Sequence, residues 1–113
     1  IEGGLGGWIH STRLALPHMG GMALKDFKWA RGGNGKWKVD WCPVGEGMVQ
    51  TREFLQMARA GGFAGPVQVH YEYDLGGADK GASKITMPKA QVLASMKKDL
   101  QALRKAADEA GWA

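Results

Sequence analysis

The sequence predicts an α/β fold with two parallel strands and three helices. Two observations predict it: helical and strand patterns alternate along the chain, and the second strand carries apolar residues at every other position. Strands that are separated by a helix normally pair in parallel. Two parallel strands are too few to stand alone. We therefore expect the missing strands to come from a larger fold or from further copies of this chain, as a homo-oligomer.

The N-terminal part contains the first predicted helix and strand. The stretch GGLGG is typical of a glycine turn, and residues 8–16 form a short helix that Pro17 ends. Residues 21–27 form a short buried strand. Residues 28–47 are rich in glycine and tryptophan and are expected to form a long loop.

The central part contains the second helix and strand. Residues 51–63 predict a helix in which Thr51 is the N-cap. Gly61 and Gly62 supply its C-terminal stop. Residues 65–73 predict the second strand.

The last helix follows a polar loop over residues 74–86. It is expected to start near Pro88, which suits a first helical turn, and to end near Ala110. Its apolar residues recur every three or four positions, as expected for a helix face that packs on a core: Val92, Met96, Leu100, Leu103, Ala107 and Ala110.

Length and composition indicate a single partial domain over residues 1–113. A hydrophobic content of 44% excludes a disordered chain. The sequence has neither an apolar run of the roughly 20 residues that a membrane span requires nor the pattern of a signal peptide. Cys42 is the lone cysteine, which fits a reducing compartment. We therefore expect a cytoplasmic protein with no membrane partner.

The net charge of +4 arises from one segment. Residues 25–38 contain five basic residues and Asp26 as the only acidic one. Trp29, Trp37 and Trp41 alternate with the lysines of this region, which is typical of a surface that stacks on nucleic-acid bases or on sugar rings. No nucleic-acid motif accompanies it. We therefore expect no nucleic-acid partner and interpret the segment as a lid over an anionic or hydroxyl-rich substrate.

The strand over residues 65–73 has one apolar or aromatic face and one polar face. An exposed strand with its polar face toward water explains this pattern, and so does a barrel strand with its polar face toward the lumen. Ala23 and Lys25 share one face of the first strand in the same way. The two faces of the second strand contain Val67, Val69, Tyr71 and Tyr73, and Gln68, His70 and Glu72.

Three stretches, in their order along the chain, resemble the C-terminal end of the sugar phosphate isomerase/epimerase family, the xylose isomerase-like TIM barrels. They are ALKDFKW, PVGEGMVQTREFL and GPVQVHYEY. The first is similar to the His-x-Lys-Asp motif of strand seven, and the last is similar to strand eight, which ends in glutamate. The resemblance covers roughly residues 1 to 110. Since a TIM barrel has eight strands, it implies that the chain is a C-terminal fragment that oligomerisation completes.

The resemblance also implies an activity, the isomerisation or epimerisation of a sugar or sugar phosphate with a divalent metal. Mn²⁺ or Mg²⁺ is implied, with Zn²⁺ as a further option; the metal polarises the carbonyl while glutamates move a proton. Glu72 matches the glutamate that acts as metal ligand and base. Lys25 matches the lysine of the motif and is either a substrate contact or an ion-pair partner. Asp26 is expected to anchor the loop.

Trp29 and Glu46 are further candidates for substrate contact. Ala23 stands where the family has a metal-binding histidine, and alanine cannot bind a metal. His70, two residues before Glu72 on the same face, either replaces this ligand or is an ordinary hydrogen-bonded histidine. Because the other ligands would lie upstream, we expect the isolated chain to be inactive. The alternative is a non-catalytic module that self-associates or binds carbohydrate.

Overall fold

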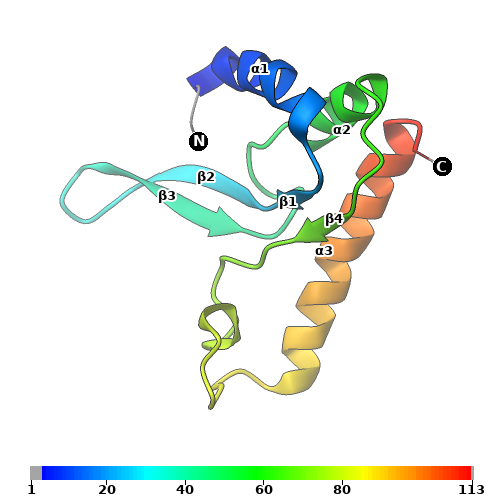
Figure 1. Ribbon diagram of the computed structural model, residues 1–113. Coiled ribbons are helices and arrows are strands. Elements are labelled where there is room, and N and C mark those ends of the chain that lie inside the picture. Colours follow the sequence, from blue (N-terminus) through cyan, green and yellow to red (C-terminus); the bar gives the residue numbers. More distant parts are fainter. Residues whose placement is uncertain (1–3, 113) are drawn as a thin grey trace.

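The computed structural model describes residues 4–112, which form three α-helices and four strands (Figure 1). Two 3-10 turns accompany them, η1 over Leu16–His18 and η2 over Ala78–Lys80. The elements follow one another as α1 (Gly4–Ala15), β1 (Met22–Leu24), β2 (Asp26–Arg31), β3 (Trp37–Cys42), α2 (Thr51–Ala60), β4 (Val67–Val69) and α3 (Lys89–Glu109).

The predicted parallel pairing is confirmed. β1 and β4 form a parallel two-stranded sheet in which Ala23 lies opposite Gln68. The N–H of His70 extends the ladder by donating to the oxygen of Leu24 at 2.8 Å. Both strands are shorter than the predicted 21–27 and 65–73. The first is shorter because the chain leaves β1 after Leu24 and enters β2 at Asp26.

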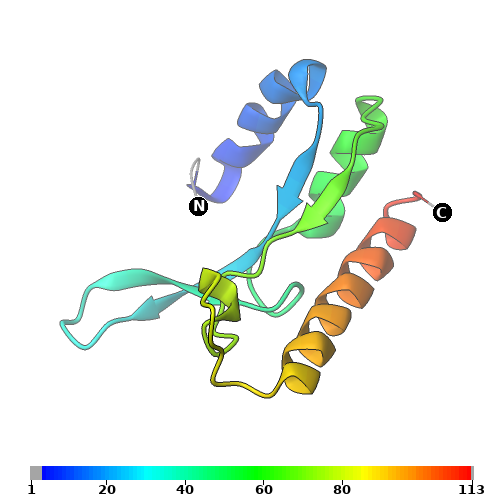
Figure 2. The same ribbon diagram turned by 60° about the horizontal axis from the view of Figure 1, so that its bottom comes forward.

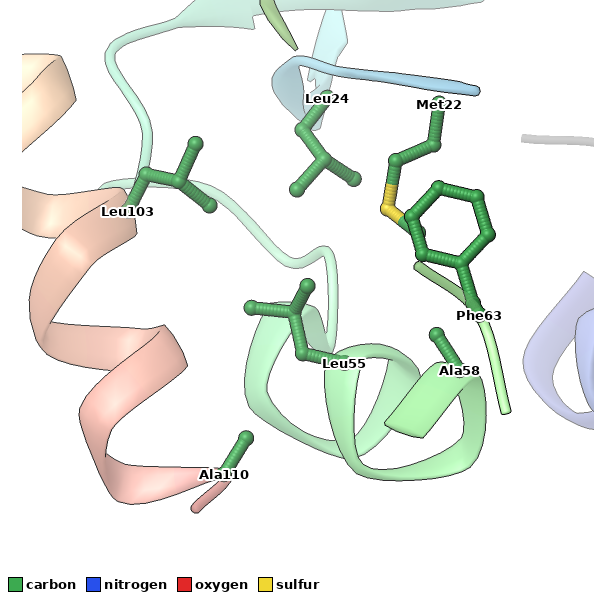
Figure 3. Packing of buried hydrophobic residues seen from close by; sticks show 7 residues of the cluster. All are labelled: Met22, Leu24, Leu55, Ala58, Phe63, Leu103 and Ala110. Atoms are coloured by element: carbon green, nitrogen blue, oxygen red, sulfur yellow. The ribbon is translucent and has the colours of Figure 1, made fainter. Parts of the chain in front are cut away.

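The core cluster lies between this sheet and the helices, with Met22 and Leu24 of β1 packed against residues of α2 and α3. Met22 and Leu24 project from β1 into the helix layer, while Ala23 between them is exposed. Leu55 of α2 is among the most buried residues of the core, so truncating it to alanine would cost about 2–5 kcal/mol. Figure 3 shows this cluster, which contains Met22, Leu24, Leu55, Ala58, Phe63, Leu103 and Ala110.

The prediction of a long loop over residues 28–47 was wrong. β2 and β3 form an antiparallel hairpin that pairs Arg31 with Trp37 at its end, and it projects away from the helices (Figures 1 and 2). The turn between the strands closes with a 2.9 Å hydrogen bond from the N–H of Gly32 to the oxygen of Lys36. Gly35 adopts a φ of 75°, which glycine tolerates. Alternating aromatic residues on both sides of a glycine-rich turn are the physical reason for the hairpin.

The first helix differs from its prediction. α1 begins at Gly4 and not at residue 8, so the expected glycine turn is wrong over residues 4–7, while Gly3 lies outside the described residues. Gly6 and Gly7 lie inside the helix, where a Cβ atom would meet nothing within 4 Å. These glycines are therefore tolerated by the helix and not required by a turn.

The ends of α2 and α3 agree with the predicted helices to within a few residues. Thr51 is the first helical residue and not the N-cap, which is Gln50. Gly61 caps the C-terminus of α2, and Gly62 follows with a φ of 75°. Pro88 is the N-cap of α3 and not a residue of its first turn.

The predicted apolar face of α3 is confirmed at Val92, Leu103 and Ala110, which are buried, and is wrong at Leu100. Leu100 is exposed, whereas Asp99 beside it is buried. Because an α-helix has 3.6 residues per turn, positions 99 and 100 both border the buried side of α3 that contains Val92 and Leu103. Within residues 4–112, no helix combines the length and apolar character that a membrane span requires.

Candidate functional site

The carboxyl ends of the two parallel strands bring Lys25 and Glu72 together. Lys25 follows β1 directly, and Glu72 lies in the extended segment after β4. The Lys25 Nζ atom lies 3.0 Å from the Glu72 Oε1 atom, and each side chain is 39% exposed. Parallel strands place their carboxyl ends at the same edge, which is why residues so distant in sequence meet here.

The neighbours of Glu72 in sequence face the helix layer. The Tyr71 hydroxyl donates to the backbone oxygen of Met96 in α3 at 3.5 Å. Tyr73 lies against Asp99 of the same helix, and Val69 packs on the core. Val67, at the start of β4, is exposed. The predicted alternation is thus observed beyond Val67, and Glu72 lies on the side of the sheet opposite the helices.

His70 lies beside Glu72 on this side. Its Nδ1 atom is 4.0 Å from Glu72 Oε1, and its Nε2 atom is 3.4 Å from the Nε2 atom of Gln68. His70 and Glu72 are both exposed; they also border an open depression of about 340 Å³ that reaches toward Met96 of α3 and is not lined by Lys25. The carboxylate of Glu72 is therefore accessible and lies between an ammonium group and an imidazole.

These donors do not form a complete metal site within this chain. No group of three or more His, Cys, Asp or Glu residues that could hold a metal occurs among residues 4–112. Ala23, at the position of the expected histidine, is exposed near the pair and offers no donor. Mg²⁺ demands near-octahedral coordination by oxygen, whereas the part of the chain that the structure describes brings one carboxylate and one imidazole together here.

The other two predicted contact residues lie apart from the pair. Trp29 projects from the hairpin and is 45% exposed. Glu46, in the loop after β3, forms an ion pair with Lys98 of α3. The hairpin adds Trp41 to the site, because Lys25 Nζ lies 4.3 Å from the centre of the Trp41 ring. The sequence alone did not connect Trp41 with the site.

Asp26 anchors the loop before α2, as its position after Lys25 predicts. The residue is buried, and its carboxylate accepts four backbone hydrogen bonds. The donors, with their distances, are the N–H groups of Phe27 (2.8 Å), Gly45 (2.9 Å), Gly47 (3.0 Å) and Val49 (3.0 Å). This carboxylate is therefore fully used in the structure and is not available to a ligand.

Asp99 and Tyr73 form a buried polar contact behind the strand. Among residues 4–112, neither carboxylate oxygen of Asp99, nor the Tyr73 hydroxyl, has a well-formed hydrogen bond. Burial raises the pKa of the Asp99 carboxyl, and the nearby Tyr73 hydroxyl and Val44 N–H offset this only in part. Burial and the neighbouring Asp99 likewise raise the pKa of Tyr73. Sequence periodicity gave no sign of this contact, since it placed Leu100 inside.

Comparison with known proteins finds a similarity in structure and not in sequence. No protein-family model matches the chain, and no curated protein matches its sequence. The structure is similar to a xylose isomerase-like TIM barrel protein from Mycobacterium smegmatis, whose crystal structure was determined in complex with magnesium. The TM-score is 0.56 at 14% identity, over 90% of this chain and 29% of that one. This mixed α/β chain therefore has the fold of part of a xylose isomerase-like TIM barrel.

Proposed function

We propose that this chain is the C-terminal part of a metal-dependent sugar or sugar phosphate isomerase or epimerase. The observation that carries the proposal is the Lys25–Glu72 pair, at the carboxyl ends of adjacent parallel strands and on the side away from the helices. In TIM barrels, the active site is built at the carboxyl ends of the strands. The structural similarity to a xylose isomerase-like barrel supports the same assignment.

Glu72 acts as the base in this proposal. A carboxylate can remove a proton from a carbon next to a carbonyl, and the proton is returned to the adjacent carbon. The Glu72 carboxylate is suited to this role because its side chain is 39% exposed and therefore accessible. Glu72 and His70 are also proposed as ligands of a divalent metal, and ligands from further strands complete the site.

Lys25 holds a substrate oxygen in this proposal. Its ammonium group has three N–H donors, and the observed hydrogen bond to Glu72 uses one of them. Trp41 lies over the same ammonium and limits where it can point. A hydroxyl, carbonyl or phosphate oxygen bound to Lys25 would lie next to the Glu72 carboxylate, within reach of proton transfer. Trp29 and Glu46 are proposed as outer contacts of the substrate.

The test uses the protein encoded by the complete reading frame. Interconversion of aldoses, ketoses and their epimers is followed by NMR with added Mn²⁺. Glu72→Gln is expected to lower kcat by about 10²–10⁴-fold, the usual contribution of a general base. The matched control is Glu109→Gln, which removes a carboxylate that also pairs with a lysine, at 3.9 Å, on the exposed face of α3; it should leave kcat unchanged.

Two results would refute the proposal. One is a complete reading frame without further strand–helix units, and the other is an activity that Glu72→Gln leaves intact. The isolated 113-residue chain provides a separate test, because we expect calorimetry to detect no micromolar binding of Mn²⁺. Micromolar binding would show that this chain already holds a metal site.

A second candidate function is self-association. β1 and β4 each have a single hydrogen-bonded neighbour among residues 4–112, so each presents an unpaired edge. Exposed edges are a template for pairing with another strand. We propose that the isolated chain is a homo-oligomer, at least a dimer. We also propose that the protein is located in the cytoplasm.

A further inference from the structure

The β2–β3 hairpin has one predominantly aromatic face. Residues that lie directly opposite each other in an antiparallel pair project on the same side, and the pairs on this side are Phe27–Trp41, Trp29–Val39 and Arg31–Trp37. The opposite side carries small and charged residues, among them Lys28 and Asp40. We define the aromatic face as Phe27, Trp29, Arg31, Trp37, Val39 and Trp41.

Mutual contacts order the rings of the aromatic face. Phe27 is buried between the two neighbouring tryptophans, with ring centres 5.9 Å from Trp29 and 6.1 Å from Trp41, both edge to face. The guanidinium of Arg31 lies 5.6 Å from the centre of the Trp37 ring. Trp29 and Trp37 are nevertheless 45% and 63% exposed. The face is thus an arranged aromatic surface whose outer rings, Trp29 and Trp37, are open to solvent.

The aromatic face continues directly from the candidate site. Lys25 contacts both Glu72, at 3.0 Å, and the Trp41 ring, at 4.3 Å, so an unbroken series of contacts joins them. The alternation of side chains also puts Lys25 on the same side as Phe27 and Arg31. Figure 2 shows how β2 prolongs the line of β1 beyond the helices.

We propose that the aromatic face is a binding surface for an acidic oligosaccharide, one end of which reaches the Lys25–Glu72 pair. The six residue-to-residue steps from Lys25 to Arg31, the last residue of β2, span about 20 Å in an extended chain, which is longer than one sugar ring. The apolar C–H faces of pyranose rings stack on indole rings, which present large apolar surfaces. A row of tryptophans therefore matches several rings in sequence.

Charge determines the acidic character of this ligand. The cations on this side, Lys25 and Arg31, lie at its two ends, whereas Asp26 and Asp40 belong to the opposite side of the hairpin. Carboxylate-bearing sugars satisfy both requirements, since their rings stack and their acid groups pair with guanidinium or ammonium. The inference deepens the proposed function and rests on it for the reacting end of the ligand, but binding to the hairpin requires this chain alone.

The test is an NMR titration of the 113-residue chain, observing the indole N–H signals. The probes are tetragalacturonate, the neutral maltotetraose with the same number of rings, and galacturonate as a single ring. Tetragalacturonate is expected to shift the signals of Trp29, Trp37 and Trp41. The Trp112 signal is an internal reference and should not move, because its indole N–H donates to the oxygen of Leu55 in the core at 3.0 Å. Maltotetraose and galacturonate should each bind at least about tenfold more weakly.

Two matched pairs of variants locate the binding. Trp37→Ala should weaken tetragalacturonate binding by about tenfold, the size of one stacking contact, whereas Leu14→Ala, at an exposed apolar residue of α1, should not. Arg31→Gln should weaken it as well, whereas Lys38→Gln on the opposite side of the hairpin should have less than a twofold effect.

Several outcomes would overturn the inference. These are the absence of binding, equal binding of maltotetraose, tighter binding of a tetrathymidylate to the same tryptophans, or indole shifts that depend on protein concentration alone, which would identify a second copy as the occupant. Failure of the isomerase assay on the complete protein, with tetragalacturonate still bound by this chain, would refute the proposed function and leave the carbohydrate surface standing.

Discussion

Asp99→Asn tests whether the buried carboxylate behind the strand destabilises the folded chain. Asp99 is 1% exposed, and both of its oxygens lack a well-formed hydrogen bond. A buried polar group without a partner costs about 1–3 kcal/mol, and a charged one costs more. Asparagine removes the charge at nearly the same volume and can still accept from the Tyr73 hydroxyl. We therefore expect the free energy of unfolding at pH 7 to rise by about 1–2 kcal/mol.

The raised pKa of Asp99 determines whether stability rises or falls with pH. Because burial raises the pKa of Asp99 above its ordinary 3.8, the folded state binds the proton more tightly than the unfolded chain. The wild-type protein should therefore lose stability as the pH rises from 3.8 through the raised pKa, and the variant should not. The difference between the two proteins should vanish at pH values well below 3.8.

Urea denaturation followed by circular dichroism, at a series of pH values, measures this difference. A gain of 1 kcal/mol corresponds to a Tm increase of roughly 4–8 °C in a small domain. Asp108→Asn is the control, because Asp108 is an exposed aspartate of the same helix. A variant that is less stable than wild type at pH 7, with unchanged pH dependence, would refute the reasoning. It would show that Asp99 is ionised and compensated by Tyr73 and Val44.

Three further predictions concern the loop anchor, the ion pair and the assembly. Gly47→Ala should destabilise the chain by about 1–3 kcal/mol in urea denaturation, because the new Cβ would lie 2.1 Å from the Asp26 carboxylate and 2.5 Å from the backbone oxygen of Phe27; an unchanged midpoint would contradict this. Lys25→Met should change the free energy of unfolding by less than about 1 kcal/mol, as for exposed ion pairs; a larger loss would assign Lys25 a structural role beside Glu72. Light scattering of the isolated chain should give at least the mass of a dimer, and a well-folded monomer would contradict self-association.

The helices α2 and α3 could be predicted because their signals are local, and the parallel pairing because a helix separates the two strands. Apolar residues recur at helical spacing in α2 and α3, and Gly61 and Pro88 mark their ends. The hairpin was missed because Gly32, Gly33 and Gly35 suggested a loop. The alternation of aromatic residues on both sides of these glycines was the signal that identifies a hairpin.

The site could be predicted in part. Parallel pairing predicts that Lys25 and Glu72 meet, since both follow strands that end at the same edge. The contact between Lys25 and Trp41 could not be predicted without the hairpin, which returns the chain to the strand end. The burial of Asp99 could not be predicted from helical periodicity, because it depends on Val44 and Tyr73 of other segments.

The hydrogen bonds of the Asp26 carboxylate determine where the chain can accept an insertion. The carboxylate fixes Gly45, Gly47 and Val49 by their backbone N–H groups, two residues before α2 starts at Thr51. An added or deleted residue in this loop would move α2 relative to β1 and disturb the core. The hairpin turn at residues 32–35 has no such constraint and lies far from the helices (Figure 1). A peptide tag or reporter should therefore be accepted at the turn and rejected between residues 45 and 49.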